Sequence, residues 1–299
     1  MRGMRLQRVG TMLVACAASM WGFWPYFLRN AESFGKVDPA LESTFAMGMC
    51  IVLGVLVVKN DRVPVRANAR AWFGIAWLGV SDALNALFFF KAYQTTSVAV
   101  AVLTHYLAPL FVAIAAPFLV SERADRRTSI AVLLSFGGLV LLLEPWRTHA
   151  SSSTVVGATF GAASAFFYAS NVLVNKRLQP VFSGSEMMLF HALLATPLLA
   201  ALVPRDAWHS LDVRALHWLI AGSVFSGAIP GLLFVWGLRA IPASRASTLT
   251  LLEPLVAVVI VGVMIFGEAI NALAASGGLL ILAGAALVLS RTERKWIAA

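Results

Sequence analysis

The chain has 299 residues, of which 60% are hydrophobic and only 12% are charged, and its mean hydropathy is +0.82. A soluble domain carries about a quarter charged residues and under half apolar ones. The composition therefore excludes a soluble single-core protein, a disordered chain and, despite the net charge of +9, a nucleic-acid binder. Ten spans of about 20 residues each would leave only short loops, so we expect no extramembrane domain.

Apolar runs separated by short charged, Gly-containing or Pro-containing breaks predict ten membrane-spanning helices. A transmembrane barrel would instead show alternating strands of about ten residues. In chain order the predicted spans cover about 9–28, 40–58, 71–91, 95–120, 128–144, 155–175, 185–203, 215–237, 244–266 and 269–290. Cys16 and Cys50 both lie inside such runs, so we expect no disulfide framework.

The distribution of Lys and Arg predicts the orientation of the chain. If the ten spans alternate in direction, 17 of the 23 basic residues fall on the side that holds both termini, and six fall on the other side. Basic residues accumulate on the cytoplasmic side of a membrane. The sequence thus predicts a multi-pass protein of the inner (plasma) membrane with both termini in the cytoplasm, and the +9 charge is a signal of topology.

The two halves of the sequence resemble each other at an offset of about 146 residues. Ser81 and Phe89 match Ser226 and Phe234, and Pro109-Leu110 matches Pro254-Leu255. With a one-residue slip, Glu122 also matches Glu268. Because each half holds five spans, an odd number, the second repeat must be inverted relative to the first. We expect the repeats to cover residues 1–148 and 149–299 and to place a substrate site between them, near the membrane midplane.

The chain resembles the EamA-type permeases of the drug/metabolite transporter superfamily, in their ten-helix, two-repeat form. The motifs that carry the resemblance are Gly10 to Trp21-Gly22, Thr96-Ser97 followed by Ala101 and Pro109, Leu252-Glu253-Pro254, and Phe266-Gly267-Glu268. The resemblance implies an all-α membrane fold around a central cavity and the transport of small metabolites across the inner membrane, usually outward. The chain departs from the family at Ala108-Pro109, where the family often has Glu-Pro.

Ionisable residues inside the spans are the sharpest functional signal. Each costs about 2.5–3.5 kcal/mol at a helix centre, so such residues usually face a cavity or a partner. Asp82, His105 and Glu253 fall near the middle of predicted spans three, four and nine. Asp82 and His105 are candidates for proton coupling, because an acid and a group that titrates near neutrality can both exchange protons. The alternatives are that Asp82 caps a broken helix or pairs with His105, that His105 is a buried neutral residue, and that Glu253 is structural.

Further candidates for the cavity share faces with these residues. Asn85 and Phe89 follow Asp82 at helical spacing, and Tyr168 and Asn171 repeat the pattern in span six. Trp21 is the repeat counterpart of Tyr168, so the two could form an aromatic wall. Three prolines are expected to bend their helices, and they are Pro109, Pro230 and Pro254.

These features favour a secondary transporter that exports amino acids or similar small metabolites by alternating access, with proton coupling as an option. The sequence holds no HExxH, phosphate-cradling loop or Cys/His metal cluster, so we expect no enzyme, cofactor or resident metal, and no nucleic-acid partner. An intramembrane enzyme that uses the midplane carboxylates or histidine and a membrane sensor or scaffold stay open as alternatives. The sequence fixes neither the substrate nor the oligomeric state.

Overall fold

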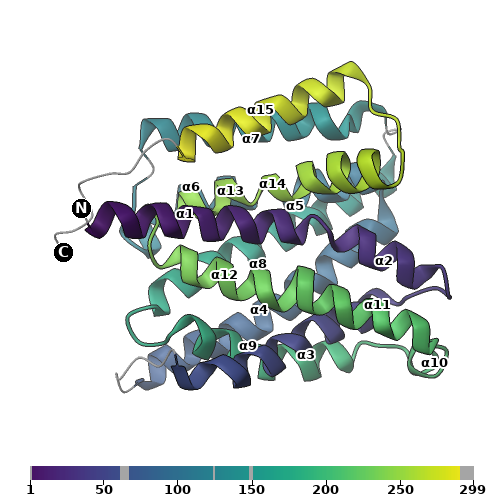
Figure 1. Cartoon of the computed structure of the whole chain (residues 1–299), viewed down its shortest axis with the longest axis horizontal. Coiled ribbons are helices and arrows are strands. Elements are labelled where there is room, and N and C mark those ends of the chain that lie inside the picture. Colours follow the sequence, from purple (N-terminus) through teal and green to yellow (C-terminus); the bar gives the residue numbers. More distant parts are fainter. Residues whose placement is uncertain (1, 61–66, 124, 148–150, 290–299) are drawn as a thin grey trace.

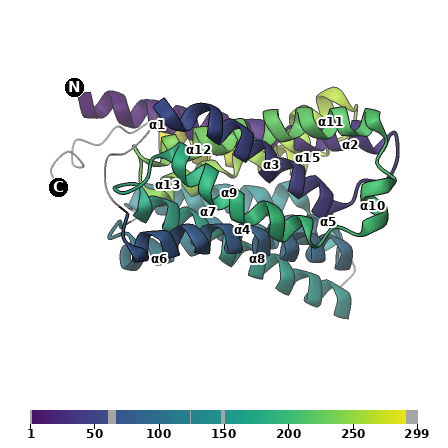
Figure 2. The ribbon, with the colours of Figure 1, turned by 90° about the horizontal axis from the view of Figure 1, so that it is seen from below.

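The computed structural model describes residues 2–60, 67–123, 125–147 and 151–289, which form a bundle of helices that run roughly along one axis (Figures 1 and 2). Nine helical runs in the described residues are long and apolar enough to cross a membrane, and Gly184–Ala200 is a shorter apolar helix. Together they confirm the ten predicted spans. In chain order the nine are Arg5–Glu32, Pro39–Val57, Ala69–Thr95, Val98–Leu119, Arg126–Arg147, Ser152–Leu178, Val213–Leu238, Ala243–Ile265 and Ala272–Leu289.

Six spans are built on single uninterrupted helices. These are α3 (Pro39–Val57), α4 (Ala69–Thr95), α7 (Arg126–Leu143), α8 (Ser152–Leu178), α9 (Gly184–Ala200) and α15 (Ala272–Leu289). Polar side chains at the N-caps fix where they begin: Asn68 accepts from the Ala71 N–H at the start of α4, and Ser183 forms a capping box with Glu186 at the start of α9. Three short helices lie in connections or at span ends, η1 (Val58–Asn60), η2 (Pro145–Arg147) and α10 (Arg205–His209).

The other four spans are interrupted. Span one consists of α1 (Arg2–Trp21) and α2 (Trp24–Glu32), and span four of α5 (Val98–His105) and α6 (Ala108–Leu119). Span eight consists of α11 (Val213–Ser223), the π-helical η3 (Val224–Ala228) and α12 (Ile229–Leu238). Span nine consists of α13 (Ala243–Leu249), α14 (Leu252–Leu255) and the π-helical η4 (Val256–Ile265). Interrupted helices leave backbone groups free to line a site.

The prolines that were expected to bend helices all lie beside these interruptions. Pro109 is the second residue of α6, Pro230 is the second residue of α12, and Pro254 lies in the one-turn α14. Proline lacks the N–H of the helical ladder, so it is accommodated at the start of a new segment. The glycines at the break of span eight are not tightly packed, since a Cβ at Gly231 would meet nothing within 4 Å, whereas Gly222 and Gly237 nearer the ends of the span pack closely on span one.

The helix pairing follows the inverted repeat. The fifth and tenth spans pack against each other (α7 with α15), as do the second and seventh (α3 with α9). The third span packs on the sixth (α4 with α8), and the first packs in the same way on the eighth (α1 with α12, α2 with α11). In Figure 1, α1 begins and α15 ends at the same end of the bundle, as an even number of spans requires. The chain is thus a multi-pass membrane protein made of two inverted five-helix repeats.

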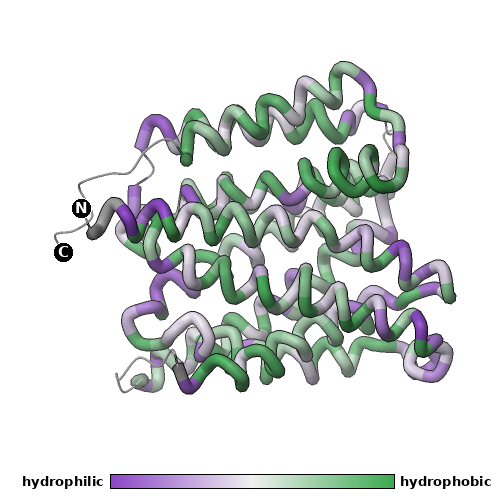
Figure 3. Tube along the Cα trace, viewed as in Figure 1, coloured by the Kyte–Doolittle hydropathy of each residue, from purple (hydrophilic) through white to green (hydrophobic). Residues whose placement is uncertain are grey.

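We call the end where α1 begins the terminal end and the opposite one the distal end. Figure 3 shows polar residues gathered at both ends and apolar residues between them. The basic residues counted on the side of the termini lie in connections and helix ends at the terminal end, for example Arg123, Arg177 and Arg239. Part of that count lies outside the described residues (Arg62, Arg66, Arg291, Arg294 and Lys295), as does the predicted repeat boundary between positions 148 and 149.

Candidate functional site

The site is built on the two longest uninterrupted helices, α4 and α8, which pack side by side. Neither contains a proline, so both keep a continuous hydrogen-bond ladder through the middle of the bundle. Phe88 stacks on both Phe160 and Phe167 at centroid distances of 6.0 and 5.7 Å, and the Trp77 indole N–H donates to Ser170 Oγ at 2.6 Å. These contacts hold the polar side chains of the two helices in fixed register.

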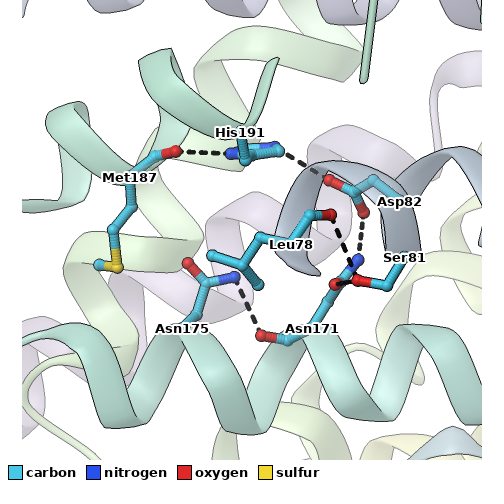
Figure 4. Close-up of polar contacts among 7 residues, drawn as sticks. All are labelled: Leu78, Ser81, Asp82, Asn171, Asn175, Met187 and His191. Atoms are coloured by element: carbon cyan, nitrogen blue, oxygen red, sulfur yellow. Dashed lines mark hydrogen bonds and ion pairs between the residues drawn. The ribbon is translucent and has the colours of Figure 1, made fainter. Parts of the chain in front are cut away.

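Asp82 lies at the midpoint of α4 and joins three helices (Figure 4). Its Oδ2 lies 2.9 Å from His191 Nε2 of α9, and its Oδ1 accepts a hydrogen bond from the Asn171 amide of α8. Ser81 Oγ donates to the other end of the Asn171 amide. We call Ser81, Asp82, Asn171 and His191 the acid–imidazole cluster.

The hydrogen bonds of His191 define how this cluster holds protons. His191 Nδ1 lies 2.7 Å from the Met187 carbonyl oxygen, so this nitrogen carries a hydrogen and donates. Nε2 faces a carboxylate oxygen, and that contact also needs one hydrogen between the two atoms. The hydrogen resides either on the imidazole, giving an ion pair, or on the carboxyl group, giving two neutral partners. The pair can therefore hold one exchangeable proton.

A second set of polar contacts lies one to two turns along the same helices. Ser164 Oγ of α8 donates to Asn85 Oδ1 at 2.7 Å, so it accepts from His105 Nδ1, which lies 2.8 Å away. The His105 ring also contacts Phe89 and Tyr168, at centroid distances of 4.6 and 5.4 Å. His105 is thus held by a hydroxyl and aromatic rings.

Glu253 lies across the bundle, where the interruptions of spans four and nine meet. Tyr106, in the gap between α5 and α6, packs in one cluster with Leu251 and Leu255, which lie on either side of Glu253. Tyr168 lies close to Thr250, in the gap between α13 and α14. Tyr168 therefore connects the His105 group to the Glu253 group.

The second repeat lacks the acid and amide of the first. At the positions that correspond to Asp82 and Asn85 it has Gly227 and Pro230, which lie in or next to the π-helical segment of span eight. The aromatic part of the site is retained. Trp21 and Phe234, the counterparts of Tyr168 and Phe89, contact each other with their ring centroids 5.4 Å apart. Polar side chains are thus concentrated on the straight helices α4 and α8, whereas their counterparts in the other repeat, spans eight and one, form the interrupted pair.

The predicted site residues therefore fall into three groups. The first group lies together on α4, α5 and α8 and consists of Asp82, Asn85, Phe89, His105, Tyr168 and Asn171. Glu253 adjoins this group through Tyr168. Trp21 lies apart from it, on span one. All are partly exposed except Asn171, which is buried and uses its amide to join α8 to α4. The suggested partnership of Asp82 with His105 does not form: Asp82 binds His191, and it caps no break, because α4 is continuous.

Sequence reasoning missed four residues of the site. His191 lies inside the predicted span 185–203 and meets the same criterion that selected His105, an ionisable side chain in an apolar run. Ser81, Ser164 and Tyr106 give no comparable signal, because hydroxyl groups are common in membrane helices and usually bond to their own backbone. Within the described residues, no group of three or more His, Cys, Asp or Glu side chains could hold a metal ion.

Comparisons with known proteins agree with this architecture. The model of the EamA-like transporter family matches residues 8–144 and again 155–290. An uncharacterized transporter of Archaeoglobus fulgidus is 30% identical over 280 residues, which cover 94% of this chain and 96% of the relative. The riboflavin transporter of Vibrio cholerae is 29% identical over 208 residues, 66% of either chain. A crystal structure that is 20% identical shares the fold, with a TM-score of 0.78 over 93% of this chain and 97% of its own.

Proposed function

Because the chain belongs to the EamA-like transporter family, and so to the drug/metabolite transporters, we propose that it exports amino acids or similar small metabolites across the inner membrane by alternating access. The chain is a transporter and not an enzyme, since both its family and its named relatives are transporters. Under this proposal the terminal end faces the cytoplasm, and the units 1–148 and 149–299 form the two repeats around a central cavity.

The observation that carries the proposal is the Asp82–His191 pair in the middle of the bundle. Asp82 keeps 22% and His191 keeps 12% of its side chain exposed, although both lie between helices. An ionisable pair at this depth is expensive unless water or a ligand reaches it, so partial exposure supports a site that opens to an aqueous cavity. Asn85, Phe89, His105 and Tyr168 add amide, imidazole and aromatic contacts beside it.

The same pair supports coupling to protons. The negative charge of Asp82 can be balanced either by a proton on His191 or by the ammonium group of a substrate. When the ammonium group binds Asp82, the imidazolium is no longer stabilised and releases its proton to water. Each cycle then exchanges one proton for one cationic group, which allows a proton gradient to drive export. The other candidate for coupling, His105, is less suited to it, because it contacts a hydroxyl and aromatic rings.

Proton-driven flux in proteoliposomes tests this proposal. Metabolite profiling of cells and medium, with and without expression, selects the substrates to load. Labelled amino acids are included as the proposed class, and riboflavin is included because of the Vibrio relative. We expect Asp82→Asn to lower flux about ten-fold or more, since losing one partner of a buried charge pair costs about 2–5 kcal/mol. Asp212→Asn, at the N-cap of α11 outside the cluster, is the control and should transport normally, because asparagine is also a good N-cap.

Two outcomes would contradict the proposal. Coupling through the acid–imidazole cluster or His105 fails if Asp82→Asn and His105→Gln both transport like the wild type with an unchanged pH dependence. The cavity fails if cysteines placed at Asn85, Phe89, Tyr168 and Glu253 are all inert toward small polar thiol reagents. Binding of a substrate without any flux would point to the sensor alternative.

A further inference from the structure

Each repeat ends its fourth span with the same turn, which presents a glutamate. Ser121 and Gly267 both adopt positive φ, 57° and 69°, directly before Glu122 and Glu268. The Glu122 N–H donates to the Ala116 carbonyl at 3.3 Å, and the Glu268 N–H donates to the Gly262 carbonyl at 2.9 Å. Because the repeats are inverted, one glutamate lies at the terminal end and the other at the distal end.

Both glutamates form ion pairs with bases that also correspond between the repeats. Glu122 Oε1 lies 3.3 Å from Lys176 Nζ in the last turn of α8, and Glu268 Oε1 lies 2.7 Å from Arg29 Nη1 in the last turn of α2. Lys176 and Arg29 close the sixth and first spans at their carboxyl ends, which are equivalent places in the two repeats. The fold therefore builds one ion pair of the same design at each end.

The terminal pair is buried and is bonded to neighbouring helix ends. Only 7% of the Glu122 side chain and 15% of the Lys176 side chain are exposed. Glu122 Oε2 accepts from the Ala243 N–H that starts α13, at 2.7 Å, and Lys176 Nζ donates to the carbonyl oxygens of Leu238 and Ile241 at 2.7 and 2.8 Å. A carboxylate at a helix start and an ammonium at a helix end match the polarity of both helices. This pair ties α6 and α8 to the turn between α12 and α13.

The distal pair, in contrast, is exposed. The Arg29 and Glu268 side chains are 53% and 51% exposed, and the helix that corresponds to α13 is capped by its own Ser97. The two half-helices differ in the same sense, since all seven residues of α13 are buried, whereas only Val100 and Ala101 are buried in α5. The helix ends are therefore packed more tightly around the terminal pair than around the distal pair.

We propose that Glu122–Lys176 and Glu268–Arg29 are the two gates of the transport path and that they close alternately. In the structure the Glu122–Lys176 gate is closed on the α12–α13 turn. In the opposite state, Glu268 and Arg29 would seat on the turn between α4 and α5, and the terminal pair would become exposed. This inference rests on the alternating access of the proposed function and assigns the residues that decide which end is open.

Thiol labelling of two matched reporters tests the gates without any substrate. The background is the full chain with Cys16→Ala and Cys50→Ala, and the reporters are Ser247→Cys on α13 and, separately, its repeat counterpart Val102→Cys on α5. Ser247 is fully buried here and Val102 is not. In detergent, Glu122→Gln or Lys176→Met should speed the reaction of the Ser247 reporter with a polar maleimide about ten-fold, as expected when a buried ion pair is broken. The Val102 reporter should react more slowly in the same variants.

Adding Glu268→Gln to Glu122→Gln should return both reporters toward their original rates, because the second change weakens the gate of the opposite state. Opposed changes of the two reporters and this reversal support the gates. A rise in both reporters, the signature of a loosened fold, would overturn the proposal, as would unchanged rates in all variants. Either result would leave transport itself untouched, because flux is measured separately in proteoliposomes.

Discussion

At the scale of single residues, the polar groups of this apolar bundle are stabilised by partners on other helices. Asp82 alone is held by groups of α8 and α9, so three spans converge on one carboxylate. In a low-dielectric interior an unpaired charge is costly, and each partner therefore contributes to folding as well as to the site. Residues that serve both purposes should respond to substitution in stability as well as in transport.

His191 is the residue whose contribution to stability can be measured most directly. We expect His191→Ala to lower the free energy of unfolding by about 3 kcal/mol, because it leaves Asp82 without its charge partner. His217→Ala controls for loss of the bond from Nδ1 to the carbonyl four residues earlier, which both histidines make; His217 is exposed, whereas His191 is largely buried and contacts Asp82. Unfolding of the purified proteins in detergent measures the difference.

Equal losses in the two histidine variants would show that the Asp82 contact adds nothing to stability. If the contact matters, Asp82→Asn combined with His191→Ala should cost less than the sum of the single changes, because a neutral amide in place of the carboxylate no longer needs the imidazole.

At the scale of helices, equivalent spans of the two repeats differ in polarity and in continuity. Asp82 and Asn85 leave α4 straight and polar, whereas Gly227 and Pro230 interrupt the corresponding span eight. Glycine and proline are the residues that weaken a helical ladder. The interrupted pair, spans one and eight, is thus suited to bending, while the straight pair keeps the acid–imidazole cluster in place.

The pair α7 and α15 is held together by close backbone contact. A Cβ at Gly277 would collide with the Gly138 carbonyl oxygen, so Gly277→Ala should force the helices apart and cost about 1–3 kcal/mol of stability. At Gly137 nothing lies within 4 Å of the added carbon, so Gly137→Ala should be neutral or slightly stabilising. Thermal unfolding in detergent compares the two, and similar stabilities would refute the close-packing account.

At the scale of the whole molecule, ten spans and two inverted repeats place both chain ends at one end of the bundle. The basic residues of the sequence are concentrated at that end, which predicts that it faces the cytoplasm. Under the proposed alternation, the two ion pairs at opposite ends are the inner and the outer gate.

Cysteine labelling of intact cells checks this orientation. In the cysteine-free background, a membrane-impermeant maleimide should label Ser210→Cys, in the exposed connection between α10 and α11 at the distal end. It should not label Pro180→Cys, which is exposed at the terminal end, until the cells are permeabilised. The reverse pattern would mean that the positive-inside interpretation of the loops is wrong.

Much of the architecture follows from the sequence because its determinants are local. Runs of about 20 apolar residues define spans one by one, and the odd number of spans in each repeat is enough to imply inversion. The motifs from Gly10 to Glu268 also carry the family, which the two matches of the family model confirm. The positions of Pro109, Pro230 and Pro254 indicated where the helices are interrupted.

Which side chains meet was decided only by the tertiary structure. Asp82 could have reached His105 on the neighbouring span, yet it binds His191, because partners in a bundle depend on helix rotation and register, which hydropathy does not encode. Likewise Glu122 and Glu268 are equivalent in sequence, but one is buried on the ends of α12 and α13 and the other is exposed. An inverted repeat specifies two equal ends, and only packing in three dimensions buries the ion pair at one of them and exposes it at the other.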